Sequence, residues 1–216
     1  MITKKAFTLA EILIAVAIIG IIGALAIPNV RSAGKQKEIF SKANKAALTL
    51  DTAIVSMMKD YGTFDTVIRG KTTDSEASEA VVSALGKYIK YNTKCIKTSE
   101  NKACFYTGTI KKSDNTEFSP TYPETSNALP TPGDSANCSS AIINDGNAIA
   151  LCVSSADYNS CTQSYCPIAS VWIDINGPTN GPNKLSEDIF FGYIDDAGFK
   201  EGYESISALE DGSFND

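Results

Sequence analysis

Residues 4–11 read Lys4-Lys5-Ala6-Phe7-Thr8-Leu9-Ala10-Glu11, and an uncharged apolar run continues from Ile12 to Ile27. As a helix, residues 7–27 give about 20 mostly apolar residues, which is enough to span the hydrocarbon core of a membrane. A carboxylate inside such a run is costly, and it is by default a functional group. The segment therefore raises the question of which positive group neutralises Glu11.

A cut between Ala6 and Phe7 would supply that positive group. The new α-amino group of Phe7 would be a cation, able to pair with Glu11 of a neighbouring chain. The segment resembles the cleavage and N-methylation signal of type IV pilins and type II secretion pseudopilins. The family usually has Gly before the cut, where this chain has Ala6. It also tends to carry a helix-loosening Gly and a Pro further along, where this chain has Gly20 and Pro28.

The resemblance implies a structural filament subunit with a pilin-like fold. Residues 1–6 would be a leader removed by prepilin peptidase, 7–27 a transmembrane and filament-core helix half, 28–60 an amphipathic half, and 61–216 a globular head. The implied partners are other pilin or pseudopilin subunits, an assembly platform in the bacterial inner membrane, and membrane lipid. Lys4 and Lys5 would stay cytoplasmic, which places the head outside. The mature subunit would then join a cell-surface or periplasm-spanning filament.

Three alternatives to this interpretation remain open. A removable secretory signal also has Lys residues, an apolar core and a small-x-small exit, which Ala24-Leu25-Ala26 imitates. An unprocessed single-span anchor is the second, although it gives Glu11 no partner. The mature N-terminus distinguishes these two from pilin processing, because it would be Ile27, Met1 or Phe7 respectively. The third is a different function, a helix-anchored monomeric adhesin or binding module outside the cytoplasm.

Apolar residues beyond Pro28 recur at steps of three and four, which predicts one face of a helix. They are Phe40, Ala43, Ala47, Leu50, Ile54, Met57 and Tyr61. We therefore predict one long helix from Phe7 to about Asp60, kinked at Pro28 and ended by Gly62. Thr73-Asp74-Ser75-Glu76 resembles a capping box and predicts a second helix, ending at about Lys90.

Four segments rich in β-branched and aromatic residues predict strands. They are Cys104 to Ile110, Asn147 to Val153, Ala169 to Ile175 and Ile189 to Ile194. Asp145-Gly146 is a turn signal before the second of them. Ser119 to Asn137, with Pro120, Pro123, Pro130 and Pro132, reads as an irregular loop. The predicted fold class is α+β: a long N-terminal helix packed on a small antiparallel sheet, with disulfides stabilising the head.

Six cysteines follow the apolar segment, at positions 95, 104, 138, 152, 161 and 166. An even number in a polar region predicts a disulfide framework in an oxidising compartment. Sequence does not choose among the fifteen pairings that six cysteines allow. We favour Cys95–Cys104 and Cys161–Cys166 across short loops, which leaves Cys138–Cys152. A metal-binding or redox role of these cysteines is disfavoured, because the chain has no His and no Cys-x-x-Cys pair.

The stretch from Ile173 to Asp188 is the second candidate functional segment. Asp174 and Asn176 lie two residues apart, Gly177 follows, and Asp188 comes beyond a Gly/Pro/Asn-rich stretch. Such residues offer several hard oxygens to one cation, and Ca²⁺ takes six to eight of them. The stretch is similar to the Gly-Pro-Asn segment of the pseudopilin that builds the type II secretion filament, where a calcium loop occurs. The alternative is a turn satisfied by Asx hydrogen bonds.

The sequence gives no support to an enzyme. Without His, a Ser or Cys triad lacks its usual base, and no phosphate-cradling Gly loop or His-Glu-x-x-His motif is present. The formal net charge of −6 argues against nucleic acid as a routine partner. A cluster of five basic residues follows the apolar segment: Arg31, Lys35, Lys37, Lys42 and Lys45. Because of this cluster, DNA remains an alternative partner if the filament is an uptake pilus. We expect no required cofactor, and calcium is the candidate ligand just described.

Overall fold

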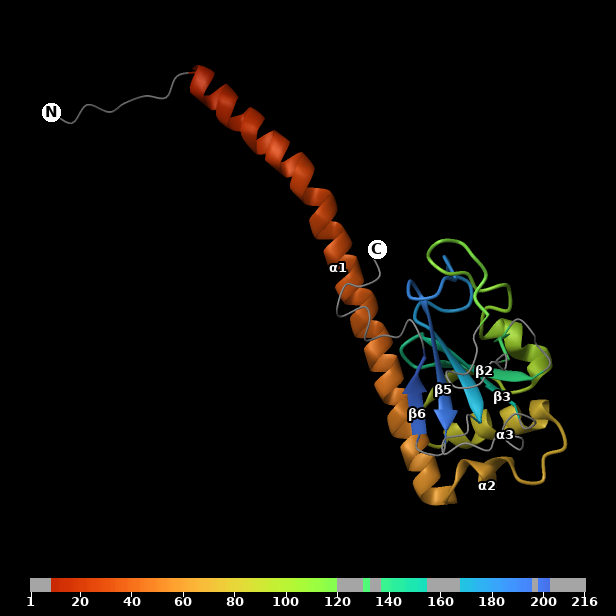
Figure 1. Ribbon diagram of the computed structural model, residues 1–216. Helices are drawn as coiled ribbons and strands as arrows, with labels where there is room; N and C mark the ends of the chain where they lie inside the picture. The colour runs from red at the N-terminus through yellow and green to blue at the C-terminus, as the bar shows by residue number, and fades with distance from the viewer. Residues whose placement is uncertain (1–8, 120–129, 133–136, 155–167, 196–197, 203–216) are drawn as a thin grey trace. The chain divides into compact units, whose positions relative to one another are not determined.

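The computed structural model describes residues 9–119, 130–132, 137–154, 168–195 and 198–202 (Figure 1). The helices are α1 (Leu9–Tyr61), α2 (Phe64–Ile68) and α3 (Asp74–Leu85), with a short 3-10 helix η1 (Thr98–Ala103). The strands are β1 (Tyr91–Cys95), β2 (Cys138–Ile143), β3 (Ala148–Val153), β4 (Ala169–Asp174), β5 (Ile189–Asp195) and β6 (Gly198–Glu201). The α+β class predicted from the sequence is therefore confirmed.

The chain divides into two compact units, Met1–Glu38 and Ile39–Asp216, and α1 contributes residues to both. In the first unit, residues 9–38 are helical throughout. Among the residues that the structure describes, none of the helices combines the length and the apolarity needed to cross a membrane. The membrane-spanning half over residues 7–27 stays a prediction.

The second unit is built on one antiparallel meander whose strands follow chain order from β1 to β6. The β2–β3 hairpin closes through the predicted Asp145-Gly146 turn, where Gly146 takes a φ of 87° and Ile143 N–H donates to the carbonyl of Asn147 at 2.8 Å. Successive side chains point to opposite faces of each strand. Because β3 and β4 are buried on both faces, they read in the sequence as nearly continuous apolar runs.

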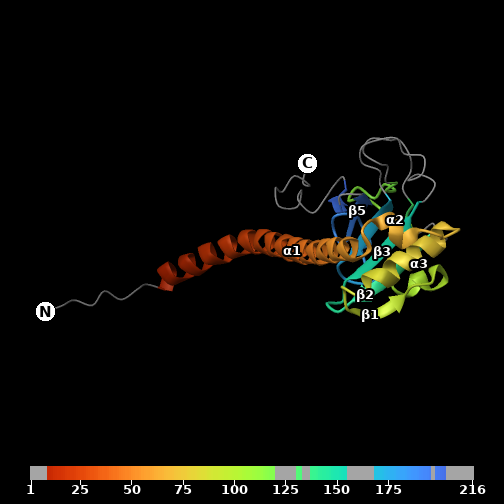
Figure 2. The same ribbon diagram turned by 90° about the horizontal axis from the view of Figure 1, so that it is seen from below.

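One face of the sheet carries the larger core, in which the second unit's part of α1 packs together with α2, α3 and the sheet. Figure 2 shows α3 lying over β2 and β3. From α1 the core takes Leu50, Ile54 and Met57, each no more than 1 % exposed. The apolar spacing in residues 40–57 thus predicted the buried face of this helix.

The opposite face carries a smaller core centred on Trp172, Phe191 and Phe118. The Trp172 and Phe191 ring centroids are 4.9 Å apart, and Phe118 meets both rings edge-on at about 6 Å. These edge-to-face arrangements are favoured by the aromatic quadrupole. This core fixes the segment after η1 against the sheet, and Trp172 is completely buried in it.

The end of α1 and the start of α3 lie close to their predicted positions, but α3 ends early, and the predicted start of the long helix at Phe7 lies outside the described residues. α1 runs to Tyr61 and stops at Gly62, whose φ is 90°. Thr73 caps α3, and its hydroxyl accepts from Glu76 N–H at 3.2 Å. The predicted end at Lys90 is wrong, because Gly86 takes the C-cap position directly after Leu85. The structure also adds α2, where the sequence predicted only a connection.

Three of the four predicted strands are confirmed, as β3, β4 and β5. The strand predicted over Cys104 to Ile110 is wrong: Phe105 is buried there, but the backbone is irregular and forms no strand. The sequence missed β1, β2 and β6. In β1 and β2 polar side chains hide the strand signal, and buried Ser139 and Ser140 donate to the carbonyls of Ile96 and Asn101. Most of the predicted 119–137 loop lies outside the described residues.

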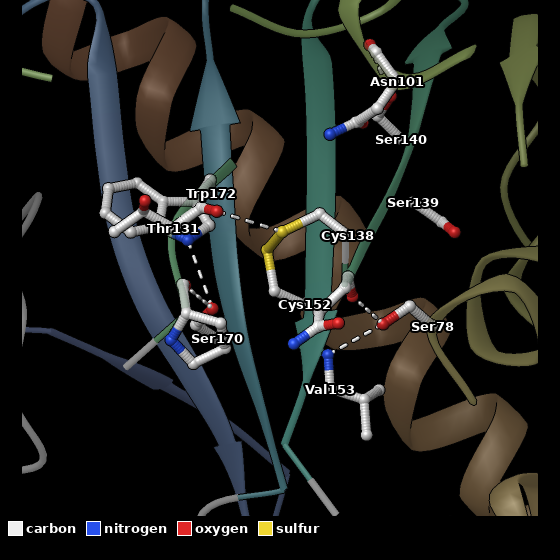
Figure 3. Close-up of a disulfide and its surroundings, with 12 residues drawn as sticks. Ser78, Asn101, Thr131, Cys138, Ser139, Ser140, Cys152, Val153, Ser170 and Trp172 are labelled. Atoms are coloured by element: carbon white, nitrogen blue, oxygen red, sulfur yellow. Dashed lines mark hydrogen bonds between the residues drawn. A yellow bond between two sulfur atoms is a disulfide. The ribbon is translucent and has the colours of Figure 1, made fainter. Parts of the chain in front are cut away.

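Two disulfides confirm the pairings favoured from the sequence. Cys95 at the end of β1 joins Cys104 after η1, with their Cα atoms 5.9 Å apart. Cys138 and Cys152 are register partners on β2 and β3, and their disulfide lies beside Trp172 and Thr131 (Figure 3). The predicted Cys161–Cys166 pair lies outside the described residues. The two bonds tie η1 to β1 and lock the β2–β3 hairpin.

Candidate functional site

The loop between β4 and β5 brings the three predicted cation ligands together. Asp174 ends β4, and Asp188 directly precedes β5, so the register pair Asp174–Ile189 places both carboxylates at one end of this hairpin. Asn176 lies between them. Its backbone N–H donates to Asp174 Oδ1 at 3.0 Å, and its Nδ2 donates to Asp188 Oδ2 at 3.1 Å.

Backbone N–H groups hold both carboxylates in place. Asp174 Oδ1 also accepts from Gly177 N–H at 2.9 Å, and the φ of 84° at Gly177 allows the tight turn that this needs. Asp188 accepts from Asn183 N–H at 2.8 Å and from Lys184 N–H at 2.7 Å. The Asx hydrogen bonds of the alternative interpretation are therefore present. They satisfy only part of the oxygens in the loop.

Three buried oxygens in this loop have no hydrogen-bond partner among the described residues: Asp174 Oδ2, Asn176 Oδ1 and Asn183 Oδ1. The orientation of the Asn176 amide is set by its Nδ2, which donates to two acceptors, the Gly181 carbonyl and Asp188. Its Oδ1 is therefore an acceptor without a donor. Buried unsatisfied acceptors are costly, and a cation or ordered water is what usually satisfies them.

The electrostatics of the loop also favour a cation. Asp174 is fully buried and Asp188 is 2 % exposed, and neither forms an ion pair within the described part of the chain. Burial raises the pKa of the Asp174 carboxyl to about 6, and the charge of Asp188 adds to the rise against the opposing N–H groups of Asn176 and Gly177. A bound divalent cation would relieve this penalty, because it stabilises the ionised carboxylates.

The ligand chemistry suits a hard cation such as Ca²⁺. Within the described residues, no group of three or more His, Cys, Asp or Glu side chains could hold a metal. The loop has two carboxylates, so amide and carbonyl oxygens would complete the shell, as they do in many calcium sites. Sequence reasoning did not select Asn183. The Gly-Pro-Asn tripeptide was its only signal. Its amide oxygen is buried, and its backbone φ is 56°.

The predicted processing and assembly residues lie in or before α1. Ala6 and Phe7 are outside the described residues. Glu11 lies in the first turn of α1, where the positive end of the helix dipole favours a carboxylate. Gly20 and Pro28 lie within the continuous helix, although their surroundings are not among those described. In the described part of this segment, every residue from Leu9 to Ile18 is exposed.

A groove of about 700 Å³ runs along α1 within the second unit. Its apolar walls come from Phe40, Leu48, Ala53 and Tyr88, and the rest is mainly hydroxyl-bearing residues of α1. Three of those hydroxyls donate back into the helix at 2.8 Å: Thr49 to the Lys45 carbonyl, Thr52 to that of Leu48, and Ser56 to that of Thr52. The groove therefore combines these methyl groups and rings with three polar residues, Ser41, Asn44 and Lys45. It can accept another apolar surface without stranding those hydroxyl protons.

Comparison with protein-family models, with curated proteins and with solved structures finds no match to this chain.

Proposed function

We propose that this chain is the structural subunit of a filament of the type IV pilus or type II secretion pseudopilus kind. In this proposal prepilin peptidase removes residues 1–6, and methylated Phe7 becomes the N-terminus. The apolar half of α1 first crosses the inner membrane and then enters the filament core. The head stays outside the cytoplasm, where its disulfides are stable.

The observation that carries this proposal is the exposure of large apolar side chains around the start of α1. Leu9, Leu13, Ile14 and Val16 are each at least 60 % exposed, and together they cover more than one side of the helix. Burying one such side chain contributes about 1.5–3 kcal/mol. A segment of this kind needs lipid or other apolar helices around it. A filament subunit meets lipid in the inner membrane and other apolar helices in the filament core.

Analysis of the mature protein and of its assemblies tests the proposal. The chain is expressed with a prepilin peptidase and the matching assembly platform. Edman sequencing and mass spectrometry are then expected to give a methylated N-terminus at Phe7, and electron microscopy is expected to show fibres. A start at Ile27 would identify a secretory signal instead. A chain that starts at Phe7 or Met1 but stays monomeric on the cell surface would support the helix-anchored binding module.

Within this proposal, Glu11 pairs with the α-amino group of Phe7 in a neighbouring subunit and so fixes axial register. Glu11→Gln keeps the size of the side chain but removes the charge. We expect this variant to insert and to be processed normally, while the yield of fibres falls at least tenfold. Ser113→Ala, an exposed change in the head, serves as the control. Normal fibre yield from Glu11→Gln would refute the register role and leave processing unaffected.

We further propose that the β4–β5 loop binds Ca²⁺ through Asp174, Asn176 and Asp188, with Asn183 as an additional ligand. The three orphaned oxygens and the two buried carboxylates support this assignment. The ion would supply positive charge to the loop and stabilise the end of the hairpin. Calcium at a thousand times its Kd would add about 4 kcal/mol to the free energy of unfolding.

Thermal unfolding of the full chain with and without calcium tests the site. The melting temperature of the chelated protein is expected to rise by several degrees as calcium is added, because each 1 kcal/mol shifts a domain of this size by about 2–4 °C. Asp188→Asn should lose most of that rise. Equal melting temperatures with calcium and with chelator would count against the site and would leave the filament proposal standing.

A further inference from the structure

A second pocket, distinct from the cation loop, lies on the sheet face opposite to the helices. Its volume is about 360 Å³, which is near the lower end for small-molecule sites. The two arms of the hairpin that follows η1 form its walls, with residues 107–110 on one side and 117–119 on the other, and Thr131 closes it. No part of the proposed filament function uses this pocket.

The base of the pocket is rigid before any ligand arrives. Phe118 is 8 % exposed, and its ring is held edge-on between Trp172 and Phe191. Phe118 N–H donates to the carbonyl of Ile110 at 3.0 Å, which ties the two arms together. The Lys111 carbonyl accepts from Leu185 N–H at 2.8 Å, which fixes the hairpin to the segment before β5. A preformed pocket binds without the cost of ordering its walls.

The walls present polar groups that form no hydrogen bond with the described part of the chain. Within the described residues, the side chains of Thr107, Thr109, Glu117 and Ser119 form no hydrogen bond or ion pair. The backbone N–H groups of residues 107–109 likewise donate to no described partner. The pocket thus offers hydroxyls that both donate and accept, backbone donors, and one carboxylate acceptor, all above an aromatic base.

These groups select the chemistry of the ligand. The Glu117 carboxylate lines the pocket and no Lys, Arg or His does. Lys112 Nζ lies 5.9 Å from the centroid of the Phe118 ring but outside the lining, so an anion would meet Glu117 and no lining cation. An apolar ligand would displace water from the hydroxyls without replacing its hydrogen bonds. One carboxylate with hydroxyls is too weak a set for a dedicated metal site. A neutral molecule with several hydroxyl groups and an apolar ring face matches every wall.

We propose that this pocket binds a small neutral saccharide. The hydroxyls of Thr107, Thr109 and Ser119 form hydrogen bonds with the sugar hydroxyls. The Glu117 carboxylate accepts hydrogen bonds from one or two sugar hydroxyls. Phe118 provides the apolar base beneath the ring. Binding requires only the head's own residues, and so it is independent of whether the chain forms filaments.

Saturation-transfer NMR on the full chain tests the proposal, in a zwitterionic detergent whose head group is not a sugar. The probes are the methyl glycosides of glucose, galactose, mannose and N-acetylglucosamine, and inorganic phosphate is the anionic probe. At least one glycoside is expected to receive saturation, and phosphate is expected to cause no shift change at these residues. Absence of transfer to all four glycosides, or a response to phosphate alone, would overturn the proposal.

Matched variants locate the binding. Thr109→Val keeps the shape of an exposed side chain and removes its hydroxyl, and Glu117→Gln removes the charge. Each is expected to weaken the responding glycoside about tenfold, the effect of one lost hydrogen bond. Ser113→Ala lies on the same hairpin outside the pocket and should bind as the unmodified chain does. Unchanged affinity in both pocket variants, with melting temperatures also unchanged, would overturn the assignment to this pocket.

Discussion

Asp174 is a carboxylate whose surroundings favour a proton or a cation over a free negative charge. It is fully buried, its nearest charged neighbour in the loop is Asp188, and one of its oxygens has no donor within the described chain. Two backbone N–H groups hold the other oxygen. These contacts orient the side chain but do not offset the loss of water, and the result is the raised pKa.

The raised pKa predicts a pH dependence of stability in the chelated protein. The folded state holds the Asp174 proton up to about pH 6, whereas an unfolded Asp releases it near pH 4. The contribution of Asp174 to the free energy of unfolding is therefore greatest below about pH 4, and it is lost as pH rises through about 6. The loss from this group between pH 4 and 7.5 should be about 2–3 kcal/mol.

Urea unfolding with chelator at several pH values measures this loss. Asp174→Asn is the matched variant, since its amide does not titrate, and its stability should fall by about 2–3 kcal/mol less than that of the unmodified chain over the same range. Calcium should reduce the fall in the unmodified chain. Parallel pH profiles for the two chains would show that Asp174 titrates normally.

Three of the four proposed ligands could be predicted from the sequence, because Asp174, Asn176 and Asp188 carry oxygens at short spacings around a glycine turn. Asn183 could not be. Its amide enters the loop interior through a positive φ and through the return of the chain onto Asp188, where its N–H donates at 2.8 Å. Both are properties of the folded loop, and the residue types in the sequence indicate them only weakly.

Asn183→Gly tests the additional ligand. Glycine tolerates the positive φ and keeps the backbone N–H, so the change removes only the amide group. We expect calcium affinity, measured by isothermal titration, to fall about tenfold, which corresponds to about 1.4 kcal/mol. Thr179→Ala, at an exposed position in the same loop, is the control. Equal affinities for the two variants would remove Asn183 from the ligand set.

At the scale of elements, the sequence predicted best where a single physical signal dominated. The apolar spacing of α1 and the β-branched runs of β3, β4 and β5 each reflect burial, because the buried side chains in these elements are mostly apolar. β2 was missed because its buried serines hydrogen-bond to carbonyls outside the sheet, so that polar residues occupy a buried strand. The false strand after Cys104 has strand-like residues, but a disulfide and a hairpin set its backbone instead.

The N-terminal cap of α3 gives a prediction at this scale. Thr73 accepts from Glu76 N–H, and Glu76 in turn accepts from Thr72 N–H at 2.9 Å and from the Thr72 hydroxyl at 2.8 Å. The first turn of the helix thus loses one acceptor in Thr73→Ala. We expect about 1 kcal/mol less stability by chemical denaturation. Ser83→Ala, exposed in the last turn of the same helix, should change stability by less than about 0.5 kcal/mol. A Thr73→Ala variant as stable as the unmodified chain would show that water replaces the cap.

At the scale of the whole molecule, two surfaces of one chain both expose apolar side chains that another copy of the chain can bury. The start of α1 exposes Leu9, Leu13 and Ile18. The groove beside Leu48 has a partly apolar lining, in which three of the α1 hydroxyls donate within their own helix. Leu48 itself is 59 % exposed. Rows of side chains four residues apart lie along both segments, and such rows pack as ridges into grooves. If subunits assemble as proposed, the apolar segment of one copy can lie in the groove of another.

Cross-linking between copies tests this pairing directly. In the double variant Leu13→Cys with Leu48→Cys, oxidation of assembled fibres should give a ladder of covalent multimers on denaturing gels without reductant. The matched control joins Leu13→Cys with Lys102→Cys, an exposed position on the head away from the groove. It should give few multimers. The two described disulfides join residues of one chain, and fibres of the unmodified chain oxidised in the same way give the background from the other native cysteines. Fibres that form normally but cross-link no better through Leu48 than through Lys102 would exclude the groove as the contact and leave the filament function intact, whereas monomers alone would count against the filament itself.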